Sequence, residues 1–342
     1  MQIRKNISLK EYNTFGIDVK AKKFASFKSE QELLELLNHI PVKEIKLMLG
    51  GGSNILLLHD IDGYVLKNDI DGIEIIKEDE EFVYVRSGAG ENWHRFVLFC
   101  LEHNYAGVEN LALIPGNVGA SPMQNIGAYG VEIKDVFHEL EAIHLYEKHK
   151  RTFSIEECRF GYRESVFKRE LKGQYIITSV TFKLDKNPLF QTSYGAIQQE
   201  LDRMEKELSI QSIAQAVINI RSSKLPDPGV IGNAGSFFKN PVISNQHYEK
   251  LKKEFPAIVA FAVNEQQTKL AAGWLIEHSA PKDALSWKGY RQGDAGCFIK
   301  QALVLVNYGN AKGNEIYKLS EDIINSVKNK FNIELEREVN VI

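Results

Sequence analysis

One segment, residues 232–241, most constrains what this chain can fold into. It reads Gly-Asn-Ala-Gly-Ser-Phe-Phe-Lys-Asn-Pro, which combines small residues, polar side chains and two adjacent phenylalanines. Small residues allow unusual backbone dihedrals or a close approach of the backbone to a ligand. The segment therefore predicts a ligand-binding loop. The structural alternative is a tight turn before a strand, with Phe237 and Phe238 simply buried.

The length and charge of the chain narrow the class of protein. Its 342 residues are enough for two or three domains. A net charge of −3 gives no field that favours nucleic acid or an anionic membrane. No apolar run reaches membrane-spanning length, and the N-terminus has no apolar core of signal-peptide length. We therefore expect a cytoplasmic protein with no nucleic-acid or membrane partner.

The cysteines and histidines give no sign of a metal site. Cys100, Cys158 and Cys297 are odd in number and far apart, without metal-ligand spacing, which excludes a disulfide scaffold or a zinc site. His138 and His144 share parity on one expected strand and are interpreted as a surface pair. We expect no metal.

Several nucleotide and hydrolase motifs are absent from the sequence. There is no Gly-Lys dipeptide of a P-loop, no HExxH, no GxSxG and no complete GxGxxG. P-loop NTPases, zincin metalloproteases, α/β-hydrolases and Rossmann dehydrogenases are therefore excluded. A glycine-rich cofactor site of another type remains.

Secondary-structure patterns place these glycine-rich segments between regular elements. Residues 45–49 form a short apolar strand that runs into three glycines, and residues 111–130 combine high glycine content with little charge. The composition of residues 111–130 favours a buried loop that packs against something other than protein side chains. Further strands are expected at 82–86, 175–184, 302–307 and 332–342, and a hairpin of two strands at 135–146 and 151–155. Helices are expected at 33–40, 93–101, 198–208, 212–222, 246–255, 269–277 and 314–331. Ser29 and Glu32 predict a capping box at the start of the first helix. Strands and helices mix without a βαβ rhythm, which predicts an α+β fold.

Four segments need one explanation: LGGGSN at 49–54, IPGNVGASPMQNIGAYG at 114–130, GYRES at 161–165 and GNAGSFFKNP at 232–241. Together they resemble the UDP-N-acetylenolpyruvoylglucosamine reductases (UDP-N-acetylmuramate dehydrogenases), flavoproteins of peptidoglycan synthesis and so of cell wall biogenesis. The resemblance runs from Tyr12 to Glu338, and an insertion before Pro226 marks the long, type I form. It implies FAD-dependent reduction of UDP-N-acetylglucosamine enolpyruvate to UDP-N-acetylmuramate, with NADPH as reductant and a monomeric protein.

The resemblance also implies a domain arrangement within the α+β class. An FAD-binding domain like that of vanillyl-alcohol oxidase is expected as two α+β subdomains, residues 1–70 and 71–220, with a PCMH-type FAD domain over about 17–187. A C-terminal α+β substrate-binding domain would span 221–320. Residues 321–342 would form a helix and a strand that return to the active site.

By resemblance, residues 50–54 and 115–130 cradle the pyrophosphate of FAD. Consecutive glycine N–H groups suit this role because they can form an anion-binding nest, whereas a flexible turn is the structural alternative. No histidine lies in the glycine turn, so we expect non-covalent FAD. The expected FAD contacts are Gly50, Gly51, Gly52, Ser53, Asn54, Pro115, Gly116, Gly119, Ala120, Gln124, Asn125, Gly127, Ala128 and Tyr129.

The reaction itself dictates the catalytic groups. Hydride addition to C3 of an enolpyruvyl ether builds negative charge at C2 and its carboxylate, which a cation must stabilise and a proton must quench. By resemblance, Ser236 donates the proton, helped by Lys239 or a water, and Arg163 supplies the fixed charge. Glu338 is the third catalytic residue, either protonated or orienting Arg163. The structural alternatives are a loop arginine paired with Glu164 and a solvated C-terminal glutamate.

Four further residues match substrate contacts of the family. They are Tyr194, which would close over the sugar nucleotide, Lys224 for its diphosphate, Asn240 on the sugar side, and Gln301 in the pocket. Lys224 could instead be a solvated helix-end lysine, and residues 291–299 depart from the usual family sequence. Two rival functions stay open: an FAD oxidase of a small alcohol or sugar, and a non-catalytic nucleotide-binding protein.

Overall fold

The protein is described by a computed structural model over residues 2–342. The chain divides into two compact units. The first comprises the residues up to Ile7, Ala21–Gly52 and Ile61–Ser223, and the second comprises Ser8–Lys20, Ser53–Asp60 and Lys224–Ile342. Each unit is thus assembled from segments that are distant in sequence. The four-part division expected from the sequence stays a prediction.

The first unit contains a four-stranded sheet covered by helix α1 (Glu30–His39). The strand order is β1 (Arg4–Ser8), β2 (Lys20–Phe27), β5 (Ile61–Asn68) and β3 (Ile45–Leu49), and β2 and β3 both run parallel to β5. Ser29 caps α1 as predicted, because its hydroxyl accepts the Glu32 N–H at 3.1 Å. The Glu32 carboxylate, however, accepts from Lys28 N–H, one residue earlier than in a capping box.

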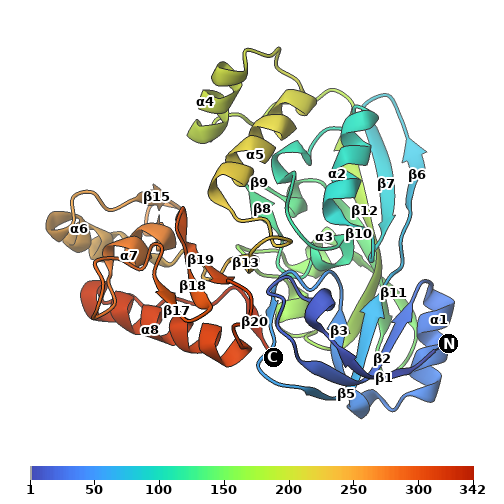
Figure 1. The fold of residues 1–342 in the computed structure, drawn as a ribbon. Coiled ribbons are helices and arrows are strands. Elements are labelled where there is room, and N and C mark those ends of the chain that lie inside the picture. The colour runs from blue at the N-terminus through green and yellow to red at the C-terminus, as the bar shows by residue number, and fades with distance from the viewer. Residues whose placement is uncertain (1) are drawn as a thin grey trace. The chain divides into compact units, whose positions relative to one another are not determined.

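A five-stranded antiparallel sheet forms the other layer of the first unit (Figure 1). Its order is β11 (Lys150–Ser154), β10 (Phe137–His144), β12 (Tyr175–Asp185), β7 (Phe82–Gly88) and β6 (Ile73–Glu78). The hairpin predicted between residues 135 and 155 is confirmed, since β10 pairs antiparallel with β11. Buried Val83, Val85, Val180 and Phe182 face the core from the two central strands.

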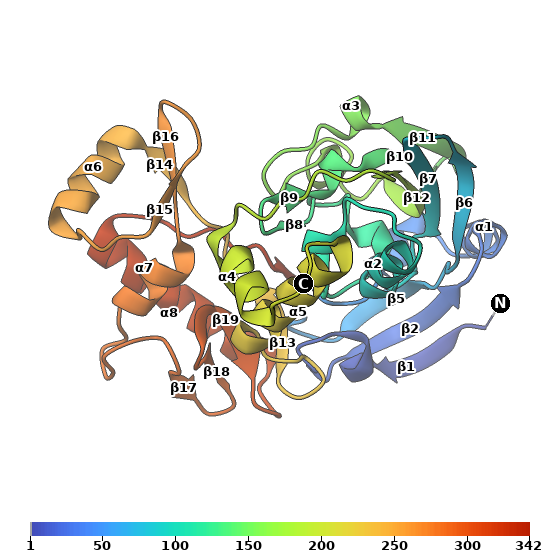
Figure 2. The same cartoon turned by 90° about the horizontal axis from the view of Figure 1, so that it is seen from above.

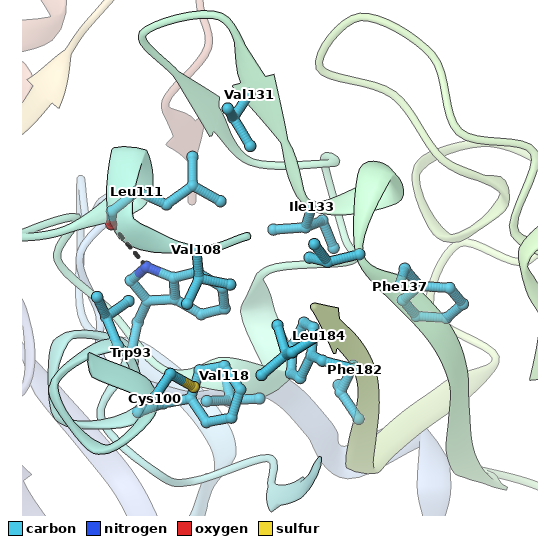
Figure 3. Packing of buried hydrophobic residues seen from close by; sticks show 14 of the residues in the cluster. Trp93, Cys100, Val108, Leu111, Val118, Val131, Ile133, Phe137, Phe182 and Leu184 are labelled. Atoms are coloured by element: carbon cyan, nitrogen blue, oxygen red, sulfur yellow. Dashed lines mark hydrogen bonds between the residues drawn. The ribbon is translucent and has the colours of Figure 1, made fainter. Parts of the chain in front are cut away.

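Helix α2 (Trp93–Glu102) fills the core beside this sheet. Its buried side chains recur at helical spacing from Trp93 to Leu101, and Asn92 caps it by accepting the Arg95 N–H at 3.0 Å. Figure 3 shows the Trp93 indole inside the cluster, where it donates to the Leu111 carbonyl at 2.9 Å. This packing fixes the segment before α2, on which the glycine-rich loop 115–130 rests.

The rest of the first unit carries the short elements that surround loop 115–130. The hairpin of β8 (Gly127–Ala128) and β9 (Val131–Glu132) lies at the end of that loop, and α3 (Ile155–Cys158) precedes the turn that contains Arg163. Helices α4 (Gly195–Met204) and α5 (Ile210–Lys224) follow the antiparallel sheet in sequence, as Figure 2 shows in yellow-green and yellow. They contribute Ile197, Leu201, Ile213 and Val217 to the core of this unit.

The second unit is built on a sheet ordered β13 (Gly232–Ser236), β19 (Gln301–Asn307), β18 (Ala295–Phe298) and β17 (Arg291–Gln292). The prediction of a loop over residues 232–236 is therefore wrong, because β19 supplies an antiparallel partner for these small residues. A second sheet is ordered β14 (Val242–Ser244), β16 (Gln267–Leu270) and β15 (Ala260–Ala262). The helices are α6 (Asn245–Glu254), α7 (Ala272–His278) and α8 (Gly313–Phe331). The helix predicted from residue 269 thus begins three residues later.

The chain ends in an extended segment after α8. Ile333, Leu335 and Val339 are buried in alternation with exposed residues, as the predicted strand requires. Regular pairing is confined to β20 (Asn340–Val341), which runs parallel to β4 (Ile55–Leu56). The mixture of parallel, antiparallel and helical elements confirms the α+β class. Over residues 2–342, no helix combines the length and apolar character needed to cross a membrane.

Candidate active site

The glycine turn after β3 lies directly against the glycine-rich loop of the first unit. A Cβ atom on Gly51 would lie 2.9 Å from the Cα of Gly116, and one on Gly119 would lie 2.4 Å from the Cβ of Ala89. These distances are shorter than van der Waals contact, so only glycine fits at both positions. Two segments predicted to bind FAD, residues 50–52 and 115–130, therefore meet through their backbones.

Backbone hydrogen bonds fix the path of this loop. Val118 N–H donates to Glu91 O at 2.9 Å, and Trp93 N–H donates to Gly116 O at 3.0 Å. Both bonds are between main-chain groups, and the Asn117 side chain adds a third bond by donating to the Gly90 carbonyl. Ser53 and Asn54, the last two residues of the predicted FAD-binding turn, belong to the second unit.

Three residues around the loop adopt left-handed backbone dihedrals, which non-glycine residues rarely do. Asn125, Tyr129 and Arg163 have φ values of +46°, +51° and +55°. Each such conformation costs about 1–2 kcal/mol, and residues of this kind concentrate at functional sites. All three belong to segments singled out by the sequence analysis. These strained conformations make the region a candidate functional site.

The Asn125 side chain is fully engaged within the protein. Its Nδ2 donates to Glu132 Oε2 and Gly161 O, both at 3.0 Å, while its Oδ1 accepts from Lys134 N–H at 3.1 Å. The buried amide thus ties the loop to the turn that contains Arg163. Its expected contact with FAD stays a prediction, and the side chain has a structural role of its own.

Arg163 points toward the glycine-rich loop. Its Nη2 donates to the Gly127 carbonyl at 2.7 Å, and its guanidinium lies 5.4 Å from the ring centre of Tyr162. A tight turn presents it, because Gly161 and Glu164 exchange backbone hydrogen bonds. The Glu164 carboxylate pairs with Arg169 Nε at 2.7 Å. The arginine is therefore positioned on the predicted FAD loop.

Tyr194 contacts the same loop from the segment before α4. Its ring packs edge-on against Tyr129, with centroids 5.5 Å apart, and the side chain is 45% exposed. Asn110 joins the two segments, since its buried Nδ2 donates to Tyr129 O at 3.1 Å and to Gln191 O at 2.9 Å. The tyrosine predicted to close over the substrate is thus anchored to the loop predicted to hold FAD. Sequence patterns gave no sign of the Asn110 bridge.

Arg221, near the end of α5, is a second residue that sequence reasoning missed. Its guanidinium lies close to the Tyr129 side chain, and its Nε is buried without a hydrogen-bond partner among residues 2–342. The helical spacing from Ile213 and Val217 places it on the apolar face of α5. A charged residue on that face was the available signal.

Ser236 is exposed at the end of β13 in the second unit. The pairing with β19 is irregular, since Asn233 opposes Val306 whereas Ser236 opposes Val304. The extra residue of this bulge lies beside Gly235, whose φ is +69° and whose N–H donates to Asn233 Oδ1 at 2.9 Å. Bulges re-aim side chains, and here the strand turns Ser236 outward before two buried phenylalanines.

The C-terminal segment pairs with the residues that follow Ser236. Glu338 N–H donates to Phe237 O at 2.9 Å, and Lys239 N–H donates to Glu336 O at 2.9 Å. The structure therefore brings the predicted proton donor and Glu338 onto neighbouring segments of one unit. Arg163 lies in the other unit.

Asn54 joins this arrangement from the turn after β3. Its Nδ2 donates to Glu338 O at 3.2 Å, and its carbonyl accepts from the Asn340 N–H at 3.1 Å. A residue of the predicted FAD-binding turn is thus bonded to the backbone of a predicted catalytic residue. Asn54 and Glu338 are far apart in the sequence, so no local pattern predicted this contact.

Lys239 is held by an ion pair. The side chain is 8% exposed, and its Nζ lies 2.6 Å from Glu336 Oε1. Its Nζ is therefore engaged by a carboxylate of the C-terminal segment, beside the backbone pairing that carries Glu338. This pair gives the lysine a stabilising function at the Ser236 site.

Two of the predicted substrate contacts in the second unit, Asn240 and Gln301, lie near the start of α7. Asn240 Oδ1 accepts the Ala272 N–H at 2.9 Å, so its carbonyl oxygen helps to begin α7. Gln301 Oε1 would lie 2.8 Å from a Cβ on Gly273 in the same helix. Lys224 is exposed at the end of α5. The α7 terminus therefore brings Asn240 and Gln301 together.

The cysteines are unsuited to chemistry. Burial raises the pKa of both Cys158 and Cys297 to about 12, and it raises the pKa of Cys100 further, so all three stay protonated thiols at neutral pH. His144, Glu147 and His149 at the β10–β11 turn form a group close enough to share a cation. That group is largely exposed, and His144 Nδ1 already accepts the Glu147 N–H at 3.0 Å.

Comparison with known proteins bears on both units. A model described as "FAD binding domain" matches residues 21–146, and the C-terminal domain of UDP-N-acetylenolpyruvoylglucosamine reductase matches residues 227–342. Proteins named UDP-N-acetylenolpyruvoylglucosamine reductase are 51% identical in Flavobacterium johnsoniae and 49% identical in Amoebophilus asiaticus, each over the whole of both chains. One from Pseudomonas savastanoi pv. phaseolicola is 47% identical over 100% of this chain and 99% of its own.

A solved structure agrees with the fold. The UDP-N-acetylenolpyruvylglucosamine reductase from Thermus caldophilus superimposes with a TM-score of 0.66 over 100% of this chain and 99% of its own, at 24% identity. The α+β expectation and the FAD-binding domain are thus confirmed. On the strength of the full-length relatives, the chain belongs to the UDP-N-acetylenolpyruvoylglucosamine reductase family.

Proposed function

We propose that this chain reduces UDP-N-acetylglucosamine enolpyruvate to UDP-N-acetylmuramate, with NADPH as the reductant. The observation that carries the proposal is the pairing of Glu338 N–H with Phe237 O, directly after the exposed Ser236. It brings the backbone segments of Ser236 and Glu338 next to each other in one unit, which supports a proposed role for both residues in proton delivery. The full-length relatives that bear the name of this activity support the same assignment.

The residues of the first unit fit a bound FAD. Glycine is required where the turn at 50–52 meets the loop 115–130, and the buried Nε of Arg221 has a hydrogen bond still to make. We propose that the backbone of these two segments binds FAD, because its N–H groups can donate hydrogen bonds to a pyrophosphate. FAD, when bound, supplies the hydride that is added to C3 of the enolpyruvyl group.

Arg163 is proposed to stabilise the charge that develops on the substrate. Hydride addition at C3 places negative charge on C2 and on the attached carboxylate. A guanidinium suits a planar carboxylate because its N–H donors form a fork and it stays ionised. The hydrogen bond to Gly127 fixes one side of the fork, so the group is oriented before substrate arrives.

Ser236 is proposed to deliver the proton to C2. One hydride at C3 and one proton at C2 saturate the double bond, and NADPH becomes NADP⁺. A serine hydroxyl is a weak acid, so the alkoxide that it leaves must be stabilised or reprotonated. Glu338, on the paired segment, is proposed to orient or reprotonate it. Such acid catalysis typically contributes about 10²–10⁴-fold to a rate.

Substrate positioning is assigned to four residues. Lys224 is proposed to bind the diphosphate as a point charge, and Tyr194 to close over the sugar nucleotide. Asn240 and Gln301, both near the start of α7, are proposed to hold the sugar and line the pocket. We further propose a monomer that acts in the cytoplasm.

The proposed reaction is tested by NADPH oxidation with and without the enolpyruvyl sugar nucleotide under anaerobic conditions. We expect oxidation to depend on the sugar nucleotide and to yield a product two hydrogen atoms heavier by mass spectrometry. In a parallel aerobic assay, a small-alcohol or sugar oxidase would instead consume oxygen without any sugar nucleotide. That outcome would replace the proposed function.

A further inference from the structure

Arg221 is fixed on the inner face of α5. The residues four and eight positions before it, Val217 and Ile213, are fully buried, so the helix turns this arginine toward the core. Figure 1 shows the last turns of α5 next to the β8–β9 hairpin, whose turn contains Tyr129. The guanidinium therefore lies beside the turn at Tyr129, which is part of the loop 115–130 predicted to bind FAD.

The charge on Arg221 has no counter-charge within the described protein. Over residues 2–342, no carboxylate lies within ion-pair distance of its guanidinium. An arginine remains protonated at any ordinary pH. A buried cation of this kind is costly unless an anion compensates it.

The neighbours of Arg221 do not supply that anion. Burial raises the pKa of the Tyr129 hydroxyl, so this neighbour of Arg221 is neutral. Burial and the Arg221 charge both lower the pKa of His94, whose Nδ1 accepts the Leu113 N–H at 3.1 Å. His94 is therefore a neutral imidazole with its proton on Nε2. The site contains a cation, two neutral polar groups and an unused N–H donor.

We propose that Arg221 binds an anionic group of FAD and supplies the fixed positive charge of the cofactor site. Its free Nε–H and its uncompensated charge are the two features that a bound anion would satisfy. FAD contains two candidates, the permanent diphosphate and N1 of the isoalloxazine ring, which becomes anionic on reduction. Positive charge beside N1 stabilises reduced flavin, whereas positive charge at the diphosphate strengthens binding of both redox states.

The inference rests on FAD binding but not on the sugar-nucleotide reaction. Its test needs no enolpyruvyl substrate, so a failure here is distinguishable from a failure of the proposed function. The variants are Arg221→Met, which removes charge and donors, and Arg221→Lys, which keeps the charge. Arg86→Met is the matched control, because Arg86 Nε is also buried without a partner but its guanidinium pairs with Glu74 at 3.3 Å.

The measurements are the dissociation constants of oxidised FAD and of riboflavin, and the two-electron reduction potential of bound FAD. A lost charge-assisted hydrogen bond should weaken the affected state roughly ten- to hundredfold. If the diphosphate is the partner, Arg221→Met weakens FAD but not riboflavin. If N1 is the partner, the potential falls by about 30 mV for each tenfold preferential loss of reduced flavin. Arg221→Lys should recover part of either effect.

The stability of the apoprotein separates this role from a structural one. Because the cation is uncompensated without FAD, Arg221→Met should leave the unfolding midpoint of the apoprotein unchanged or raise it, and should lower that of the holoprotein relative to wild type. Arg86→Met should destabilise both forms equally. The proposal is overturned if Arg221→Met destabilises apoprotein and holoprotein equally while FAD affinity and potential stay at their wild-type values.

Discussion

The glycine turn at 50–52 and strand β13 look alike in sequence, yet glycine is needed in them for different reasons. At Gly51 a side chain would collide with the neighbouring loop, so the constraint is space. At Gly235 there is nothing within 4 Å of a Cβ, and the constraint is the left-handed φ of +69°. In the turn at 50–52, glycine lets two backbone segments come into contact. In β13, glycine allows the strand to bulge beside Ser236. Glycine content alone therefore does not say which kind of site a segment makes.

The difference extends to the polar chemistry around each segment. In the first unit, a cation, Arg221, lies at the loop with no counter-charge from residues 2–342, and Arg163 bonds a loop carbonyl. In the second unit, Lys239 is already paired with Glu336, and a neutral hydroxyl, Ser236, is exposed. We therefore propose that the first region binds an anionic ligand and that the second transfers a proton.

The largest effect should come from Ser236→Ala, which removes the proposed proton donor. Product formation should slow by roughly 10²–10⁴-fold, while flavin content and its reduction by NADPH stay normal. Rapid-reaction kinetics with the sugar nucleotide measure both steps. Ser26→Ala, the same change at an exposed strand serine of the first unit, is the control. A normal rate of product formation in Ser236→Ala would show that another group is the acid.

Gly51→Ala should give the next largest effect, because its Cβ would meet the Gly116 backbone at 2.9 Å. Overpacking of this kind costs about 1–3 kcal/mol in the free energy of unfolding. Gly50→Ala is the matched control, since the nearest atom to its Cβ is 3.9 Å away. Denaturant unfolding of the two apoproteins makes the comparison. Equal stability would mean that space is not the constraint at this turn.

Gly235→Ala should cost about 1–2 kcal/mol through backbone strain alone. Gly235→Asn should cost less, because asparagine tolerates the left-handed region better than alanine does. Thermal unfolding of both holoproteins gives the order. If alanine and asparagine are equally tolerated, the dihedral is not what selects glycine in the bulge.

Lys239→Met should have the smallest effect on stability, about 0.5–1 kcal/mol. Its amino group is buried, but the partner carboxylate of Glu336 is 68% exposed, so solvent screens the pair. Glu336→Gln should cost more than Lys239→Met, because it takes the counter-charge from a buried ammonium, whereas Lys239→Met leaves an exposed carboxylate that water solvates. Added salt should narrow the difference from wild type. Urea unfolding at two salt concentrations tests this. A loss well above that range would show that the lysine holds more than this one pair.

The sequence predicted the elements that local patterns specify. Ser29 as a helix cap and the apolar spacing from Trp93 to Leu101 rest on neighbours within a few residues, and both are confirmed. Strand β13 was mispredicted because glycine, alanine and serine have weak strand propensity. Its hydrogen bonds come from β19, far along the chain, and no local window contains that information.

The candidate site, too, was predicted from the sequence only in part. Arg163, Ser236 and Glu338 were singled out by a resemblance of whole motifs, not by their own local sequence. The pairing of Glu338 with Phe237, and the bond from Asn54 to Glu338, depend on segments that meet only in the folded chain. Arg221 lies in a helix whose apolar spacing concealed one inward-facing charge.

The central claim is that the first unit holds a flavin whose reducing power is used on a sugar nucleotide. The most direct test is anaerobic reduction of the holoprotein with NADPH, followed by addition of UDP-N-acetylglucosamine enolpyruvate in place of oxygen. We predict that the flavin absorbance, lost on reduction, returns as one equivalent of UDP-N-acetylmuramate forms for each flavin. A flavin that stays reduced with the sugar nucleotide and is reoxidised only by oxygen would contradict the account.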